Sequence, residues 1–413
     1  MKLLLLQWNT FFLLSLLWIN NVQGQTTDCI DGQAPKHQMA WKNSGQVSHS
    51  HRPHFPKASL PPVSARMDQM AKLLMQAYPQ PKGLECHIRR EVDGEGDHDE
   101  YKASLSGKAS PFRYSVEGWF FTLHCDTKTG QVKREGETGT TLELHVNWLH
   151  RFMKPIDGEY SELTIANGQQ MYFMPYVVGE LKGYPVYSTQ QLTWDKRAQE
   201  SVINANRPEE SIILTADGKL PVRPVSKEEY LQALLRLQKK MVQETEKKRK
   251  ELDAILAESL TSYDKMSFSS ATDREKAKTG ARRDAEKGRS FMAKELERYT
   301  SAISSLQAII ENLSPDEKKE QVFLEEATGI LDRPDMKAAL KNQEKKGRPI
   351  VTHDFSYTDP KLPRHAIQYI QVFFKYETLS RLLAKPDMIK QVKETIDLDA
   401  LKAQVEKKVG VRP

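Results

Sequence analysis

The chain has 413 residues, of which 38% are hydrophobic, 28% charged and 8% aromatic. This balance is sufficient for a folded core and excludes a disordered polymer. At roughly 100 to 200 residues per domain, the length predicts two or three folding units. The 61 basic and 55 acidic residues leave a formal net charge of +6. So small an imbalance implies no general electrostatic attraction to nucleic acid or to anionic lipid, and no nucleic-acid partner is expected.

Residues 1–24 have the pattern of a signal peptide. A lysine is followed by two apolar runs that are too short for a stable membrane span. Val22 and Gly24 stand three and one places before the expected cleavage site, so the mature chain should begin at Gln25. The alternative is an uncleaved anchor, in which both apolar runs insert as one segment. We expect an exported protein, periplasmic or secreted, with no transmembrane anchor in the mature chain.

Residues 25–65 are predicted to form a flexible leader. They are rich in Gln, Ser, Pro and His and show no apolar periodicity. Four prolines exclude regular structure there, at positions 53, 56, 61 and 62. Residues 67–77 then carry apolar side chains at helical spacing and end at a Tyr-Pro-Gln-Pro sequence. This pattern predicts one short helix at the start of the first domain.

Residues 66–225 are predicted to be an antiparallel α+β domain. Apolar and polar residues alternate with period two, the mark of strands that bury one face. Two dipeptides, Asn167-Gly168 and Asp217-Gly218, each predict a hairpin between the apolar runs that flank them. The alternating segments are 84–88, 119–125 and 142–148.

Residues 226–314 are predicted to form an antiparallel helical hairpin, similar to a coiled coil. Ser226 and Glu229 have the spacing of a capping box, and two apolar stripes of helical period follow. Nothing apolar appears at 243–251, so that part of the first helix should lie in water. The segment 261–290 is polar and contains two glycines, which predicts a breakable connection. The hairpin should therefore project from the sheet domain and bury only part of its length.

Residues 315–413 return to mixed structure. The run 367–376 is typical of a strand, and helices are expected at 377–393 and 397–408. If this late strand rejoins the first sheet, the hairpin is an insertion; otherwise it is a separate domain. The fold class predicted is α+β, with an antiparallel sheet domain, a long helical hairpin and a mixed C-terminal segment.

No known catalytic or nucleotide-binding signature is present. The sequence contains no glycine-rich phosphate loop before a helix, no nucleophile elbow around a serine and no paired-histidine zinc helix. Neither a catalytic residue nor a cofactor nor a metal ligand is therefore assigned from the sequence. The absence of motifs makes an enzyme less expected without excluding one.

Cys86-His87 and His124-Cys125 are two adjacent pairs of soft ligands in neighbouring strand segments. A tetrahedral zinc site is disfavoured, because consecutive strand side chains point to opposite faces of a sheet. The alternation places both cysteines on the apolar face. In an oxidising compartment this favours a disulfide between Cys86 and Cys125, with Cys29 unpaired. Two packed free thiols are the alternative.

Four further features have an ordinary explanation beside a functional one. The histidines at 49, 51 and 54 resemble ligands for a transition metal, but they lie in the expected leader. The acidic cluster at 93–100 resembles part of a calcium loop, but lacks its turn glycine and its bidentate glutamate. The basic run 247–250 is bracketed by acidic residues and fits a solvated helix face. Trp119 and Trp148 are assigned to the core.

Two short segments resemble uncharacterised exported proteins of Bacteroidota-type bacteria. They are residues 210–231 (ESIILTADGKLPVRPVSKEEYL) and 359–370 (DPKLPRHAIQYI). The resemblance implies a Gram-negative envelope or secreted setting. It implies no activity and transfers no functional residue.

Three classes of function are consistent with these patterns. The first is a non-catalytic exported interaction protein whose helical hairpin binds partner proteins in the cell envelope. The second is a small-molecule or metal-binding envelope protein, and the third is a hydrolase of unrecognised type. A site of converging His, Asp or Glu side chains would favour the last two. An exposed apolar stripe on a long hairpin would favour the first.

Overall fold

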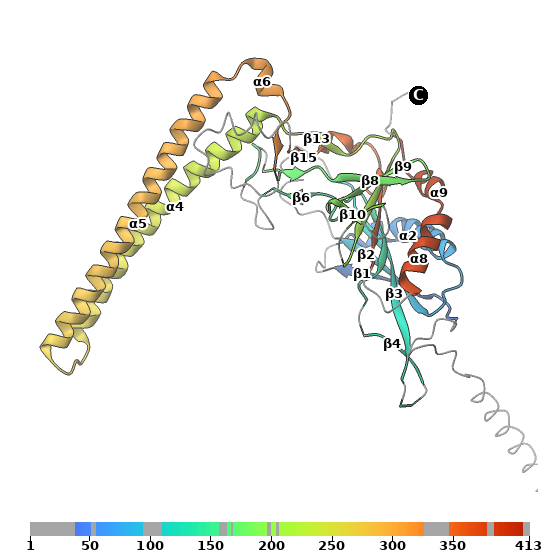
Figure 1. Cartoon of the computed structure of the whole chain (residues 1–413), viewed down its shortest axis with the longest axis horizontal. Coiled ribbons are helices and arrows are strands. Elements are labelled where there is room, and N and C mark those ends of the chain that lie inside the picture. Colours follow the sequence, from blue (N-terminus) through green and yellow to red (C-terminus); the bar gives the residue numbers. More distant parts are fainter. Residues whose placement is uncertain are drawn as a thin grey trace, which may run out of the picture.

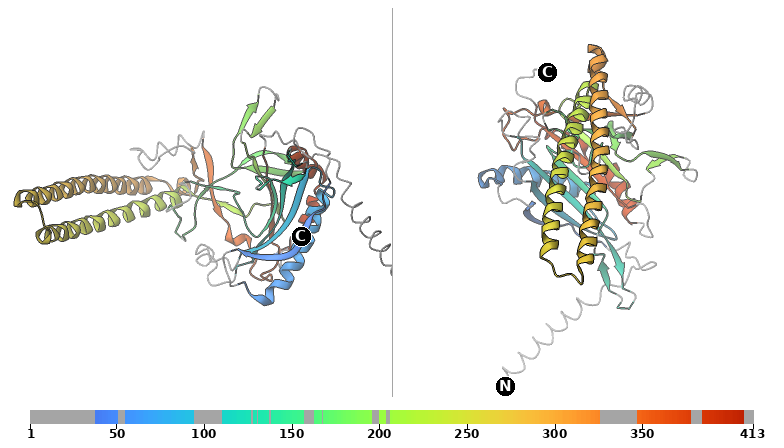
Figure 2. Two further views of the ribbon diagram at one scale, coloured as in Figure 1. Left: turned by 90° about the horizontal axis from the view of Figure 1, so that it is seen from below. Right: turned by 90° about the vertical axis from the view of Figure 1, so that its left-hand side faces the viewer.

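The computed structural model describes residues 38–50, 55–93, 110–126, 128–129, 131–136, 138–156, 163–166, 168–195, 200–203, 206–325, 347–377 and 384–407. The predicted signal peptide, the calcium-like loop beyond Asp93 and Cys29 lie outside these ranges. The described chain confirms the α+β class. A curved sheet with helices on its outer side carries a long helical hairpin that projects from it (Figures 1 and 2).

Nine strands of the described chain form one sheet. Their order is β1-β2-β3-β5-β16-β12-β9-β8, and β4 pairs with the end of β3. Every pairing is antiparallel except that of β1 with β2. The strands are β1 (Lys42–Ser50), β2 (Leu84–Asp93), β3 (Arg113–Cys125), β4 (Val132–Arg134), β5 (Thr141–Val146), β8 (Tyr176–Leu181), β9 (Tyr184–Ser188), β12 (Glu209–Thr215) and β16 (Tyr369–Lys375).

The late strand β16 lies in the middle of this sheet. One of its edges pairs with β5, from Ile370 opposite Val146 to Lys375 opposite Thr141. Its other edge pairs with β12, from Tyr369 opposite Thr215 to Lys375 opposite Glu209. The sequence predicted a strand within 367–376 and left open whether it rejoins the first sheet; these pairings show that it does. The hairpin is therefore an insertion between two neighbouring strands.

Three helices cover one face of the sheet: α2 (Leu60–Ala77), α8 (Ala384–Thr395) and α9 (Leu398–Lys402). Helix α2 buries Met67, Met70 and Leu74, which recur at helical spacing against β3. Each such side chain contributes about 1.5 to 3 kcal/mol when fully buried. At Gly118 of β3 an added Cβ would lie 2.8 Å from Leu74 Cδ2, so the glycine permits this close approach.

A smaller sheet connects the large one to the hairpin. In it β15 (Arg348–His353) pairs on one edge with β13 (Val222–Pro224) and β14 (Phe323–Leu324). On the other edge it pairs with β7 (Tyr172–Phe173), which pairs with β6 (Lys154–Pro155). A separate ribbon consists of β10 (Leu192–Asp195) and β11 (Glu200–Ile203).

The hairpin consists of α4 (Lys227–Lys265) and α5 (Ala271–Asn312), of 39 and 42 residues. At 1.5 Å per residue each helix is about 60 Å long. The capping box of Ser226 and Glu229 is confirmed. Short helix α6 (Pro315–Lys319) leads back to the small sheet. Most of the hairpin's burial is at its base, where Leu231, Leu234 and Leu306 pack together.

Three buried residues join the base of the hairpin to the small sheet. The amide of Val225 donates to the carbonyl of Ile350 (3.0 Å), and the amide of Ile350 donates to the carbonyl of Val322 (2.9 Å). The amide of Val322 then donates to the carbonyl of Val225 (3.0 Å). None of the three side chains is exposed. Both ends of the hairpin are thus held by one strand, β15.

The predicted leader at 25–65 is wrong in its described part. Residues 42–50 form β1, which pairs in parallel with β2. Helix α2 begins at Leu60, with Pro61 and Pro62 in its first turn. Proline is tolerated there because the first amides of a helix have no intrahelical partner. The prolines therefore start the helix that they were expected to exclude.

Two connections also differ from expectation. Strands β12 and β13 belong to different sheets and do not pair, so no hairpin forms around Asp217-Gly218. The segment 261–290 is helical except for the loop 266–270, and α5 continues through Gly280 and Gly288. A Cβ at Gly288 would lie 2.9 Å from Leu252 Cδ2 on α4. This glycine lets the two helices approach and does not break α5.

Candidate metal centre

The face of the large sheet that points away from α2 carries polar and aromatic side chains, and we call it the polar face. Residues directly opposite in an antiparallel sheet point to the same side. Glu117 lies opposite Glu143, and Glu143 lies opposite Phe373. Phe373 in turn lies opposite Ser211. Side chains from four adjacent strands therefore form one row across this face.

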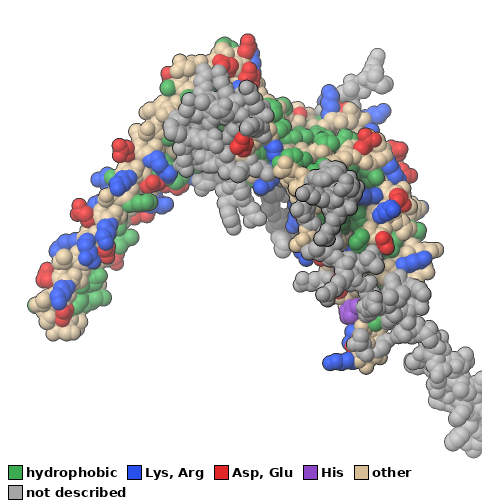
Figure 3. Space-filling view, viewed as in Figure 1, with side chains coloured by type: hydrophobic (Ala, Val, Ile, Leu, Met, Phe, Trp, Pro, Cys, Tyr) green, Lys and Arg blue, Asp and Glu red, His purple; other side chains and the backbone are tan. Residues whose placement is uncertain are grey.

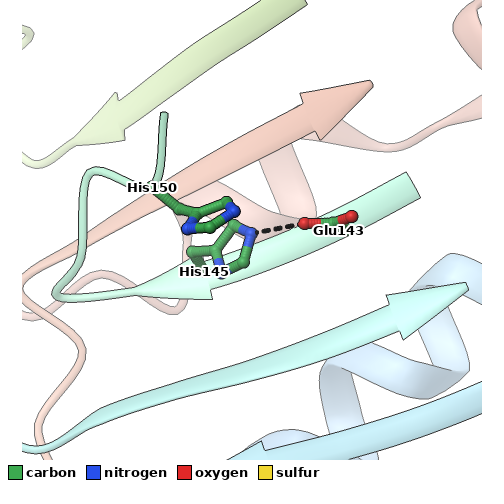
Figure 4. A group of neighbouring side chains, drawn as sticks. All are labelled: Glu143, His145 and His150. Atoms are coloured by element: carbon green, nitrogen blue, oxygen red, sulfur yellow. Dashed lines mark hydrogen bonds and ion pairs between the residues drawn. The ribbon is translucent and has the colours of Figure 1, made fainter. Parts of the chain in front are cut away.

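Glu143, His145 and His150 form a cluster on the polar face. Glu143 and His145 are two residues apart on β5 and so share a face. Glu143 Oε2 lies 2.8 Å from His145 Nε2. His150 folds back over both from the loop that follows β5 (Figure 4). One potential ligand atom from each of the three residues lies within 4.8 Å of the other two.

The loop conformation that returns His150 to the sheet is fixed by Asn147. This residue has a φ of 56°, in the left-handed region that asparagine tolerates better than most residues. Its buried amide donates to the carbonyls of Phe112 (3.0 Å) and Ala366 (2.9 Å). Its Oδ1 accepts from the amide of Gln368 at 2.9 Å. Arg151, with a φ of 50°, ends the turn.

Aromatic rings surround the two histidines. The imidazoles of His145 and His150 have centroids 4.7 Å apart. The Trp148 ring stands 5.0 Å from His145 and 4.7 Å from His150. Phe373 packs against the same pair from β16, 6.0 Å from His150. These contacts limit the rotation of both imidazoles.

Two buried polar atoms beside the cluster have no hydrogen-bond partner among the described residues. They are His145 Nδ1 and Gln371 Oε1, and these two residues lie directly opposite each other on β5 and β16. Gln371 Nε2 is satisfied, since it donates to His150 O (2.7 Å) and Ser211 Oγ (2.8 Å). An unpaired buried polar atom usually indicates a water, an ion or a functional role.

The burial of the site shifts several ionisation equilibria. Burial, together with the nearby charge of His145, lowers the pKa of His150 to about 4, so its imidazole is neutral at neutral pH. Burial, and to a smaller extent the negative charge of Glu143, raises the pKa of Glu117. Burial also acts to raise the pKa of Glu143, but the hydrogen bond and charge of His145, together with a hydrogen bond from Thr141, leave this pKa below its usual value.

Two imidazoles and one carboxylate are a donor set that suits first-row transition ions. Zinc in particular is held by His nitrogen at about 2.0 to 2.1 Å and by carboxylate oxygen at about 2.0 to 2.2 Å. The described residues contain one group of this kind, Glu143 with the two histidines. The three side chains therefore provide donor atoms suitable for a divalent metal ion.

The predicted disulfide between Cys86 and Cys125 is wrong. Cys86 lies opposite Phe120, so both point into the core beneath α2. Cys125 shares the opposite face with Leu123 and packs in a separate cluster. Cys86 is a free, buried thiol, whereas Cys125 is disulfide-bonded. The prediction failed because both faces of β3 are largely buried. The alternate apolar residues Phe121, Leu123 and Cys125 therefore do not mark the face that points into the core beneath α2.

The other residues singled out from the sequence do not converge. His87 bonds to Glu85 (2.6 Å) on the polar face, and His124 is on the opposite face, as the register requires. His49 belongs to β1, while His51 and His54 lie outside the described residues. The basic run 247–250 is exposed on α4, and Lys247 pairs with Glu251 at 3.8 Å. It is the solvated helix face that was expected.

The assignment of Trp119 and Trp148 to the core is also wrong. Both side chains are partly exposed and lie on or beside the polar face. Trp119 Nε1 donates to Glu117 (2.9 Å), and the Arg89 guanidinium lies 3.8 Å from the centre of its ring. Trp119 thus contacts charged side chains, and Trp148 contacts the imidazoles of His145 and His150.

Sequence reasoning missed the Glu143 cluster although one signal was present. The segment 142–148 was predicted as a strand, and Glu-x-His on a strand places both side chains on one face. The return of His150 depends on the left-handed conformation of Asn147, which no spacing rule reveals.

Comparisons of the chain with protein-family models, curated proteins and solved structures find no match. Among the helices that the structure describes, none combines the length and the apolar character needed to cross a lipid bilayer.

The two cysteine environments predict different chemical reactivity. Burial raises the pKa of the Cys86 thiol, so Cys86 should resist alkylation in the folded protein and react fully once the protein is denatured. The chain has three cysteines and Cys86 is free, so within one chain we now expect a link between Cys125 and Cys29, which the sequence had predicted to be unpaired. Peptide mapping without reduction should find that link, and a reduced sample is the control. A linked Cys86, or a free Cys125, would contradict the prediction.

Proposed function

We propose that the protein binds a divalent first-row transition ion, preferably Zn²⁺, between Glu143, His145 and His150. The observation that carries the proposal is the approach of three potential ligand atoms to within 4.8 Å of one another. Neutral imidazole and carboxylate are suitable ligands for zinc. Calcium and magnesium prefer all-oxygen sites, so the two histidines disfavour them.

The geometry requires only a small adjustment. Donors bound to a tetrahedral ion with bonds of about 2.05 Å are about 3.3 Å apart. The distance of 2.8 Å between Glu143 and His145 must therefore widen slightly. The other separations are below 4.8 Å, so they must contract by at most about 1.5 Å. Because His150 is on a loop whereas the other two residues are on a strand, most of this movement falls to His150.

The surroundings also fit a metal-bound histidine. Such a histidine usually donates its second ring N–H to an oxygen, which fixes its orientation. When His145 coordinates through Nε2, its Nδ1 carries the proton. Gln371 Oε1, directly opposite on β16, is a buried acceptor without a partner in the described chain. The two atoms are not hydrogen-bonded to each other, so this role requires a small shift of one of the two side chains.

Metal titration of the full chain tests the proposal. Calorimetry on chelator-treated protein should show one Zn²⁺ per chain. His150→Ala and Glu143→Gln should each weaken binding at least about 100-fold, because even residues that only support a ligand contribute 10- to 100-fold. Zinc at about 100 times its dissociation constant should stabilise the native protein by about 2.7 kcal/mol.

His124→Ala is the matched control, since it removes a partly exposed strand histidine outside the cluster. Its zinc affinity should equal that of the wild type. Unchanged zinc affinity in His150→Ala and Glu143→Gln would reject the site, and the hydrogen bond between Glu143 and His145 would then be purely structural.

We also propose that the protein is exported. Residues 1–24 have the signal-peptide pattern, and the disulfide at Cys125 favours an oxidising compartment. The intact mass of protein isolated from an exporting host should correspond to a chain that begins at Gln25. A mass that includes Met1, in a membrane fraction, would contradict export with cleavage.

A second proposed function is binding of a partner protein in the cell envelope through the hairpin. Four large hydrophobic side chains of the described chain are exposed, and three of them are on this hairpin: Ile255 (59%), Met266 (51%) and Phe291 (66%). Figure 3 shows hydrophobic, basic and acidic side chains mixed along the projecting hairpin. Ile255 and Phe291 belong to the two helices and Met266 to the end of α4, so the apolar contacts offered to a partner would be spread along the projecting part of the hairpin.

Removal of residues 246–296, replaced by a short linker, tests the hairpin. The cut retains Thr245 and Tyr299, which are buried, so the base of the hairpin should still fold. The double variant Ile255→Ser and Phe291→Ser should lose the same envelope partners as the deletion without loss of thermal stability, since both side chains are exposed. Lys248→Ser is the exposed control. Retention of all partners by the deletion would reject this function, whereas loss of self-association alone would identify a second copy of the chain as the partner.

A further inference from the structure

We infer that the metal ion at Glu143, His145 and His150 keeps one coordination position open toward the polar face, where it binds a small anion such as a carboxylate. The inference rests on the proposed metal binding. It concerns what occupies the remaining coordination position, which the protein's own donors do not fill.

The described chain supplies three donors, whereas zinc takes four or more ligands. Glu117 is the nearest candidate for a fourth, since it lies opposite Glu143 on β3. Its two carboxylate oxygens are already engaged, Oε1 by Ser115 Oγ (3.0 Å) and Oε2 by Trp119 Nε1 (2.9 Å). Glu117 is not part of the group of atoms that lie within 4.8 Å of one another, and these bonds would have to break before it could bind the ion.

The open position faces outward from the sheet. His145 is only 1% exposed and forms the floor of the cluster. Glu143, with 13% of its side chain exposed, and His150 form its accessible side. Trp148 is also partly exposed and stands beside both imidazoles. A small ligand would approach along this aromatic wall.

The charge around the cluster favours an anion. One carboxylate ligand leaves a divalent ion with a charge of +1. Arg151, which directly follows His150, and Lys375, which lies on the same side of β16 as Phe373, add positive potential. Glu209 offsets them in part, at 3.3 Å from Arg151 and 3.9 Å from Lys375, and the Glu117 carboxyl offsets them further when ionised. A carboxylate oxygen is, in addition, a good ligand for zinc.

Cobalt substitution makes the open position visible. Co²⁺ has visible absorption bands that change with its coordination, so the full chain is loaded with Co²⁺ and titrated with azide, acetate and acetohydroxamate. We expect a saturable spectral change at one anion per metal. Zinc-loaded protein should bind acetohydroxamate by calorimetry, and metal-free protein should not. Lys375→Gln should weaken anion binding about two- to fivefold, the range of a partly exposed charge.

Each result has a defined meaning. If Co²⁺ binds with one equivalent but its spectrum is insensitive to all three anions, the protein saturates the ion and the open position is wrong, although the metal site remains. If Glu117→Gln then restores a response to anions, Glu117 is the fourth ligand. If neither Co²⁺ nor Zn²⁺ binds, the proposed function fails and the open position fails with it.

Discussion

A single strand, β16, holds the large sheet together. Its two edges pair with β5 and β12, so without it the sheet would separate into β1-β2-β3-β5 and β12-β9-β8. Roughly 150 residues lie between the end of β12 and the start of β16. The entropic cost of closing such a loop grows only with the logarithm of its length, by about 0.6 kcal/mol for each doubling. A long insertion is therefore compatible with this pairing, provided that β16 itself is strongly held.

Because strand side chains alternate, β16 points every second residue into the core and the others toward the Glu143 cluster. Val372 and Phe374 point into the core beneath the helices, whereas Gln371 and Phe373 lie at the cluster on the polar face. The cluster thus needs segments that are distant in sequence. An unsatisfied buried polar atom costs about 1 to 3 kcal/mol, and His145 Nδ1 and Gln371 Oε1 are both of this kind within the described chain. Unsatisfied polar atoms that lower the stability of the fold in this way are typical of functional sites.

The sequence predicted the features that depend on neighbouring residues and failed for those that depend on contacts between residues far apart in the chain. Period-two and helical patterns are local, and they identified β2, β3, β5, both hairpin helices and the capping box at Ser226. Face assignment on β3 failed, because helices cover one side and side chains of the polar face bury much of the other, so alternation no longer distinguishes them. The partner of β13 was also unpredictable, since it comes from β15, far along the chain. The cluster combined a local signal, Glu143-x-His145, with a turn at Asn147 that depends on contacts to Phe112 and Ala366.

The attachment of the hairpin to one strand has a mechanical consequence. A sideways force at the tip acts through an arm of about 60 Å, whereas the backbone bonds at the base act across strands about 4.8 Å apart. The leverage on the junction of Val225, Val322 and Ile350 is therefore roughly twelvefold. The next residue of β15, Val351, packs in one cluster with Leu149 and Phe152, which flank His150 in sequence. Torque on the hairpin is thus carried through β15 to the loop that positions a histidine of the cluster.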